Sequence, residues 1–152
     1  MCAPDAAPGL VELSLVRERL IVVMPARHRL AARRTLHPRD LDQQPYVGVR
    51  PDIEPAWAQA AFRALKLAGA VPRLVQETDT KLSLLGLVAA GLGLSVVSES
   101  MGELTRKGVV IRPLSGLSLR LSLALLTPPA ATPRAAAFAQ LARQTFSTRT
   151  SG

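Results

Sequence analysis

The residues best suited to chemistry in this sequence stand directly after two short runs of β-type residues. Arg50 follows Tyr46–Val49, and Thr78 and Thr80 follow Leu74–Gln76. An arginine can bind a carboxylate through two parallel hydrogen bonds, and threonine hydroxyls can donate further ones. Each run is also followed by a predicted helix, whose first N–H groups and partial positive charge favour an anion. Because the carboxyl ends of parallel strands meet at one edge of a sheet, these residues predict a site for a small carboxylate there.

Several features of the same segment allow a different interpretation. Asp52 and Glu54 bring negative charge next to Arg50, which works against an anion. Trp57 could form an apolar wall of the site, but it could equally be a core side chain while Arg50 points into solvent. The two threonines could simply cap a helix, a role that is compatible with ligand contact.

Other chemistries find no suitable constellation of residues. His28 and His37 lie in basic loops without a nearby cysteine or metal-ligand spacing, so we expect surface histidines. The serines of residues 95–100 are not part of a GxSxG nucleophile elbow. Gly91-Leu92-Gly93 precedes a predicted strand and does not link a strand to a helix, so it is not a nucleotide-binding loop. We therefore expect no metal, no cofactor and no enzymatic activity.

The charge of the chain invites a nucleic-acid interpretation. The 152 residues include 19 Lys and Arg against 11 Asp and Glu, a formal net charge of +8. The densest positive group comprises six arginines, at positions 17, 19, 27, 29, 33 and 34. Hydrophobic runs interrupt this group, and no aromatic side chains are interleaved to stack on bases. We interpret it as a solvated surface, with a dedicated nucleic-acid site as the alternative.

The cysteine content and the first residues of the sequence bear on the cellular compartment of the protein. Cys2 has no partner for an internal disulfide, which fits a reducing compartment such as the cytoplasm. The first residues lack the basic start and apolar run of a signal peptide. No apolar run approaches the length of a transmembrane helix, so we expect no membrane partner.

Hydrophobic patterning predicts strands that alternate with helices. The strands are expected at Val11–Leu15, Leu20–Met24, Tyr46–Val49, Leu74–Gln76, Leu94–Val97, Val109–Ile111 and Leu119–Leu126. The helices are expected at Pro38–Gln43, at Pro55–Gly69, after the cap residues Thr78–Thr80, and from Thr132 onward. The third helix has no wholly polar face and should be largely buried, and the last helix places Phe138 and Leu141 on one face. This alternation predicts an α/β fold with a mostly parallel sheet covered on both faces.

The phrase GLVAAGLGLSVVSES (Gly86–Ser100) closely resembles the ligand-sensing domain of LysR-type transcriptional regulators. Four further landmarks resemble the family in the same order: LIVVMPARHRLA (Leu20–Ala31), Asp40-Leu41 before QQPYVGV, Ala68-Gly69 before Pro72, and GVVIRPL (Gly108–Leu114). Each landmark is weak alone, and their order and spacing are specific. Arg29 departs from the family, which usually has proline after the histidine. The resemblance extends over residues 11–146, between a loose tail at 1–10 and another at 147–152.

The resemblance implies a fold similar to type II periplasmic binding proteins, with one complete subdomain and part of the other. Family members are considerably longer and begin with a winged helix-turn-helix, so the chain looks truncated and should not bind operator DNA specifically. The family binds effectors in a cleft between the subdomains. In relatives that sense aromatic acids, the start of the helix at Pro55 touches the effector, which implies this role for Pro55, Ala56 and Trp57.

The full prediction is thus an effector-sensing regulatory domain for a small, anionic molecule. Its predicted effector-binding residues are Arg50, Pro55, Ala56, Trp57, Thr78 and Thr80. A homo-oligomer is left open. The alternatives are a stand-alone solute-binding module similar to periplasmic binding proteins, and a basic protein that binds nucleic acid non-specifically.

Overall fold

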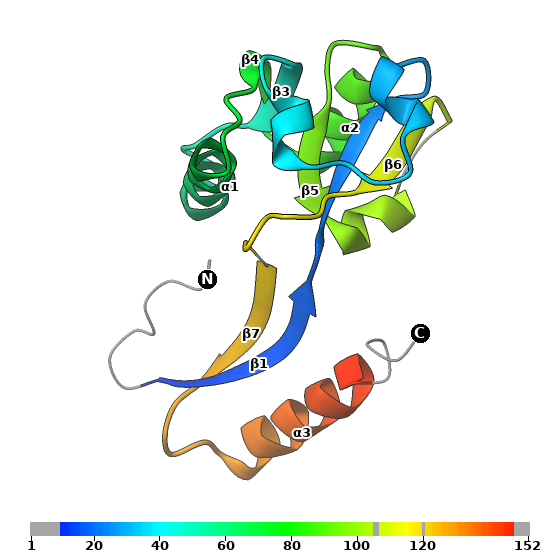
Figure 1. Ribbon diagram of the computed structural model, residues 1–152. Helices are drawn as coiled ribbons and strands as arrows, with labels where there is room; N and C mark the ends of the chain where they lie inside the picture. The colour runs from blue at the N-terminus through cyan, green and yellow to red at the C-terminus, as the bar shows by residue number, and fades with distance from the viewer. Residues whose placement is uncertain (1–9, 105–106, 120, 148–152) are drawn as a thin grey trace. The chain divides into compact units, whose positions relative to one another are not determined.

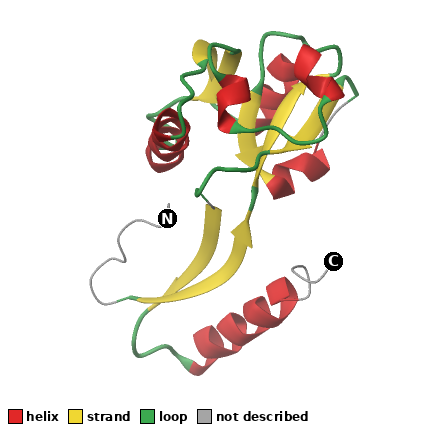
Figure 2. Ribbon diagram, viewed as in Figure 1, coloured by secondary structure: helices red, strands yellow, loops and turns green. Residues whose placement is uncertain are grey.

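The structure of the chain is a computed structural model that describes residues 10–104, 107–119 and 121–147 (Figures 1 and 2). It divides into two compact units. Unit 1 combines Met1–Glu18 with Arg120–Gly152, and unit 2 is Arg19–Leu119. The predicted tails, residues 1–10 and 147–152, fall almost entirely outside the described residues.

Unit 2 holds most of the predicted elements. Its strands are β2 (Leu20–Pro25), β3 (Pro45–Val49), β4 (Arg73–Thr78), β5 (Ser95–Ser98) and β6 (Val109–Pro113). Its helices are α1 (Pro55–Leu67) and α2 (Lys81–Ala89), together with the 3-10 segments η1 (Arg29–Ala32), η2 (Pro38–Leu41) and η3 (Glu99–Leu104). The patterning thus predicted these strands and both α-helices to within a few residues, but it missed η1 and η3.

The strands of unit 2 lie in the order β4-β3-β5-β2-β6. β3 pairs with β4 in parallel, an isolated parallel bridge between Tyr46 and Leu94 links β3 to β5, and β2 pairs antiparallel with both β5 and β6. The α/β class is confirmed, and β3, β4, β5 and β6 run in one direction, as predicted for a mostly parallel sheet. β2 runs against them, which the prediction did not contain, because an apolar run reports burial on both faces and not the direction of its neighbours.

Different elements cover the two faces of this sheet. On one face, Leu65 of α1 packs with Tyr46, Val22 and Met24, and residues of η1 and η2 complete the cluster. On the other face, α2 packs on the sheet through Leu84, Leu85 and Val88, which join Ile21, Val23, Val47, Val49 and Val97. Burial on both faces explains the nearly continuous apolar sequence of these strands.

Helix α2 is buried on one side only. Leu84, Leu85 and Val88 are at most 2% exposed, whereas Leu82 is 54% exposed. The prediction of a largely buried helix is therefore wrong for the side that carries Leu82 and Ser83. Exposed leucines such as Leu82 are common on protein surfaces, and the sequence alone does not distinguish them from buried ones.

Two glycines shape the turn between α2 and β5. Gly91 has φ +90°, a left-handed conformation that glycine adopts readily at the end of a helix. A Cβ atom on Gly93 would lie 2.6 Å from the carbonyl oxygen of Pro45. Next to it, the N–H of Leu94 donates to that oxygen at 2.9 Å, and the N–H of Val47 donates to the Leu94 carbonyl at 2.9 Å. Gly93 therefore permits the close approach that joins β5 to β3.

Unit 1 consists of an antiparallel pair of strands and one helix. β1 (Val11–Glu18) pairs with β7 (Leu121–Thr127), with an irregularity between Ser14 and Val16. The last helix, α3 (Pro133–Ser147), begins where the N–H of Ala135 donates to the Thr132 hydroxyl at 3.3 Å. A hollow of about 320 Å³ between these elements is lined mainly by small apolar side chains. Phe138 and Leu141 are 60% and 61% exposed, so the predicted apolar face of this helix is not covered within unit 1.

Candidate functional site

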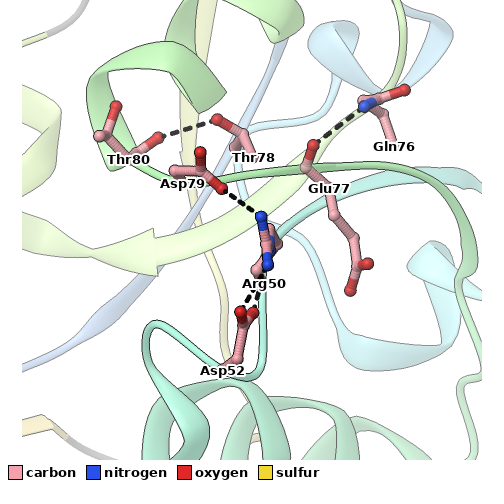
Figure 3. Close-up of polar contacts among 7 residues, drawn as sticks. All are labelled: Arg50, Asp52, Gln76, Glu77, Thr78, Asp79 and Thr80. Carbon is pink, nitrogen blue, oxygen red and sulfur yellow. Dashed lines mark hydrogen bonds and ion pairs between the residues drawn. The ribbon is translucent and has the colours of Figure 1, made fainter.

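The ends of β3 and β4 meet at one edge of the sheet in unit 2. In their parallel register, Gly48 is paired with Glu77 and Val49 with Thr78. The next residue of the β3 strand, Arg50, continues the pairing, because its N–H donates to the Thr78 carbonyl at 3.0 Å. The structure therefore brings together Arg50 and the Thr78–Thr80 junction, which are 28 residues apart in the sequence (Figure 3).

Arg50 is the centre of this edge, and two aspartates hold its guanidinium. Its Nε and Nη2 donate to the two oxygens of Asp52 at 3.0 and 2.5 Å, and its Nη1 donates to Asp79 at 3.2 Å (Figure 3). The hydrogen bond from Arg50 holds the pKa of the Asp52 carboxyl below its usual value. The same bond raises the pKa of Arg50. The guanidinium is thus oriented and always charged.

A second ion pair ties the same two segments together. Lys81, the first residue of α2, pairs with Glu54, which directly precedes α1, at 3.1 Å. Two cations and three carboxylates therefore share this edge, and their formal charges sum to −1. The side chains of Arg50, Asp52 and Asp79 are 48%, 59% and 65% exposed. Ion pairs so exposed contribute little to stability, so they can be exchanged at little cost.

The two threonines have different surroundings. Thr80 is the N-cap of α2: its hydroxyl accepts from the Ser83 N–H at 3.0 Å and donates to the Ser83 hydroxyl at 2.9 Å. Thr78 is only 8% exposed, and its hydroxyl lies at the limiting distance of 3.5 Å from the Thr80 carbonyl. Thr80 therefore caps the helix, the simpler of the two roles considered for the threonines. Among the described residues, the Thr78 hydroxyl makes only one hydrogen bond, at the limiting distance.

The start of α1 lies next in the chain after the Arg50 loop. The Arg50 carbonyl accepts from the N–H groups of Ile53 and Glu54 at 3.0 and 3.1 Å, and the helix begins at Pro55. Glu54 makes no capping hydrogen bond with its side chain, so the first N–H groups of the helix gain no acceptor from it. The side chains of Pro55 and Ala56 lie outside the described residues. Trp57 is partly buried and packs against the core cluster on the α1 face, so it belongs in part to the core.

Sequence reasoning missed two polar partners at this edge. The sequence pattern predicts Asp79 only as part of a helix cap and predicts no role for Lys81. Parallel alignment brings the residues after both strands to one edge of the sheet, but which of their side chains pair depends on the exact register. A third junction, after β5, adds Ser98 and Ser100, whose hydroxyls lie 3.2 Å apart.

The remaining candidates form no further site. The pKa of His28 is lowered by partial burial and by the charge of Arg29, and its Nδ1 accepts the N–H of Leu30 at 3.3 Å, so this histidine starts η1. Within the described ranges, no three His, Cys, Asp or Glu side chains are grouped to hold a metal ion. None of the helices in the described part of the chain combines the length and apolar character needed to cross a membrane.

Comparison with known proteins decides the family. A profile of the LysR substrate binding domain matches residues 1–147. The chain belongs to the LysR substrate-binding domain family. The transcriptional regulator TtuA of Agrobacterium vitis is 30% identical to this LysR domain over 115 residues, which are 74% of this chain and 38% of TtuA. The chain thus spans well under half of the length of such regulators.

Solved structures show the same fold for this LysR domain. The effector-binding domain of BenM with its effector benzoate superposes with a TM-score of 0.83 at 21% identity, covering 96% of this chain and 67% of that one. The effector-binding domain of QuiR in complex with shikimate gives 0.79 at 16% identity, covering 95% and 69%. The predicted fold similar to type II periplasmic binding proteins is confirmed. The relatives are transcriptional regulators and not enzymes, which agrees with the prediction.

Proposed function

We propose that this LysR domain senses a small carboxylate at the edge formed by Arg50, the Thr78–Thr80 junction and the start of α1. We further propose that it does so as the regulatory part of a cytoplasmic transcription factor, with Pro55, Ala56 and Trp57 beside the ligand. The observation that carries the proposal is the guanidinium of Arg50, which stands half-exposed where two strand ends meet.

The Arg50 guanidinium has N–H groups beyond those bound by Asp52, and these suit a carboxylate ligand. Asp52 occupies the Nε–Nη2 edge with two hydrogen bonds, which fixes the plane of the group. An arginine fixed in this way has its remaining N–H groups preorganised for a planar oxyanion. The buried Thr78 and the partly buried Trp57 lie on the adjacent segments, where they could supply a polar and an apolar contact.

The chemistry of the relatives supports the same class of ligand. Benzoate is the effector of BenM and shikimate is bound to QuiR, and both molecules are small carboxylates. A site of the same class in this chain needs a fixed cation near the strand ends, where open α/β sheets bind their ligands. Arg50 meets this requirement.

Nuclear magnetic resonance titration tests the proposal, because it measures dissociation constants into the millimolar range. The probes are sodium benzoate, sodium shikimate and benzamide, which has nearly the shape of benzoate without its charge. We expect a carboxylate to bind and benzamide not to bind. Replacing Arg50→Ala is expected to weaken binding by about fivefold, the upper end of what an ion pair at a half-exposed arginine provides. Trp57→Ala is expected to weaken it as well.

Arg73→Ala is the matched control, because it removes an exposed arginine at the opposite end of β4. We expect this variant to bind as the wild type does. The proposal is wrong if neither carboxylate binds, or if Arg50→Ala and Trp57→Ala both bind as tightly as the wild type.

A further inference from the structure

We infer that Asp79 is a specificity-determining residue of this site, because it competes with the ligand carboxylate for Arg50. This inference rests on the proposed function and adds a residue that was not among the predicted contacts. It follows from the unequal way in which the two aspartates hold one guanidinium (Figure 3).

Asp52 and Asp79 occupy different parts of the arginine. Asp52 bonds through both of its oxygens to Nε and Nη2, and it is only two residues from Arg50 in the same loop. Asp79 bonds through one oxygen to Nη1, at 3.2 Å, from the other segment. Within the described part of the chain, no carboxylate accepts hydrogen bonds from both Nη1 and Nη2 in a bidentate arrangement.

A ligand carboxylate would therefore bind along the Nη1–Nη2 edge and displace Asp79, not Asp52. The exchange replaces one hydrogen bond of 3.2 Å with two parallel ones, and bidentate pairs are the stronger arrangement. The Asp79 side chain is 65% exposed, so the released carboxylate returns to water without a burial cost. The ion pair between Lys81 and Glu54 persists, which keeps the two segments together during the exchange.

This competition selects for charge. A neutral molecule replaces a carboxylate on arginine unfavourably, because it offers a weaker acceptor than the one it removes. Asp79 thus lowers the affinity for every ligand that uses this edge, and only a planar anionic group regains in full the hydrogen bonding that is lost. The ligand class is a molecule with one unhindered carboxylate.

The test compares Asp79→Asn with wild type in a benzoate titration followed through the Arg50 Nε–H signal. The substitution keeps the shape of the side chain and removes the competing charge. We expect Asp79→Asn to bind benzoate about twofold to fivefold more tightly, the range that an exposed ion pair provides. Asp79→Glu, which restores the charge, is expected to bind as the wild type does. Asp52→Asn is expected to bind more weakly, because the guanidinium loses its orientation.

Glu77→Gln is the matched control. It removes one negative charge two residues from Asp79, on the same strand end, and no ion pair joins Glu77 to Arg50 in the structure (Figure 3). Equal gains in Asp79→Asn and Glu77→Gln would overturn the inference, because they would reflect net charge alone. Unchanged or weaker binding in Asp79→Asn, while Arg50→Ala still loses benzoate, would also overturn it and leave the proposed function intact. Benzoate binding that survives Arg50→Ala would instead remove the proposed function itself.

Discussion

Leu85 offers the sharpest test of the packing in unit 2. Its side chain is 0% exposed and packs between α2 and the sheet with Val47, Val23 and Val97. Leu85→Ala removes three buried carbon atoms, worth about 2.4 kcal/mol at about 0.8 kcal/mol each. The cavity left in a tightly packed core adds to this cost, so the free energy of unfolding should fall by about 3–5 kcal/mol.

Urea titration followed by fluorescence measures this change well, because Trp57 is the only tryptophan and packs against the core of unit 2. Leu82→Ala is the control, since Leu82 lies on the same helix and is 54% exposed. We expect the control to change the free energy of unfolding by no more than about 0.5 kcal/mol. If Leu85→Ala costs no more than Leu82→Ala, the assignment of the buried face of α2 is refuted.

Three further outcomes follow from the contacts described above. Gly93→Ala should destabilise unit 2 in the same urea assay, because the new Cβ would lie 2.6 Å from the Pro45 oxygen, and an unchanged midpoint would contradict that close approach. The pKa of Asp52, measured by NMR, should lie below the ordinary value of 3.8, so its ion pair stabilises the fold above that pH and this stabilisation is lost as the pH falls through the lowered pKa. The pKa of Asp52 should rise in Arg50→Ala, and no rise would disprove the pairing. With a formal net charge of +8, the chain should bind DNA weakly and without sequence preference, and the binding should weaken as the salt concentration increases. A clear preference for one operator in a gel-shift competition at physiological salt would contradict this expectation.

Most elements of the fold could be predicted from local patterns. The run Leu20–Met24 became β2, the Pro55 start and Gly69 end bounded α1, and Thr80 caps α2 as its position suggested. These signals are local, because capping and strand burial depend on a few adjacent residues. The direction of β2 relative to its neighbours could not be predicted, since it depends on which strands lie beside it.

The arrangement of the candidate site was predictable in part for the same reason. Arg50 and Thr78 could be placed at one edge because parallel strands of similar length end together. The ion pairs of Arg50 with Asp79 and of Lys81 with Glu54 could not be foreseen from composition, since they depend on the exact register and on side-chain reach. The uncovered face of α3, with Phe138 and Leu141 in solvent, shows that an apolar pattern predicts a contact surface without identifying what covers it.

The bridge between β3 and β5 has a consequence for how unit 2 opens. Two backbone hydrogen bonds join these strands at Pro45, Val47 and Leu94, whereas continuous ladders join β5 to β2 and β2 to β6. Partial unfolding separates a sheet where few backbone hydrogen bonds hold it, so we expect β3, α1 and β4 to open together before β5, β2 and β6 do. In native-state hydrogen exchange, the amides of the first group will lose protection at lower denaturant than those of β2. Arg50 and the start of α1 belong to the first group, so a ligand bound at the proposed site should slow amide exchange there in particular.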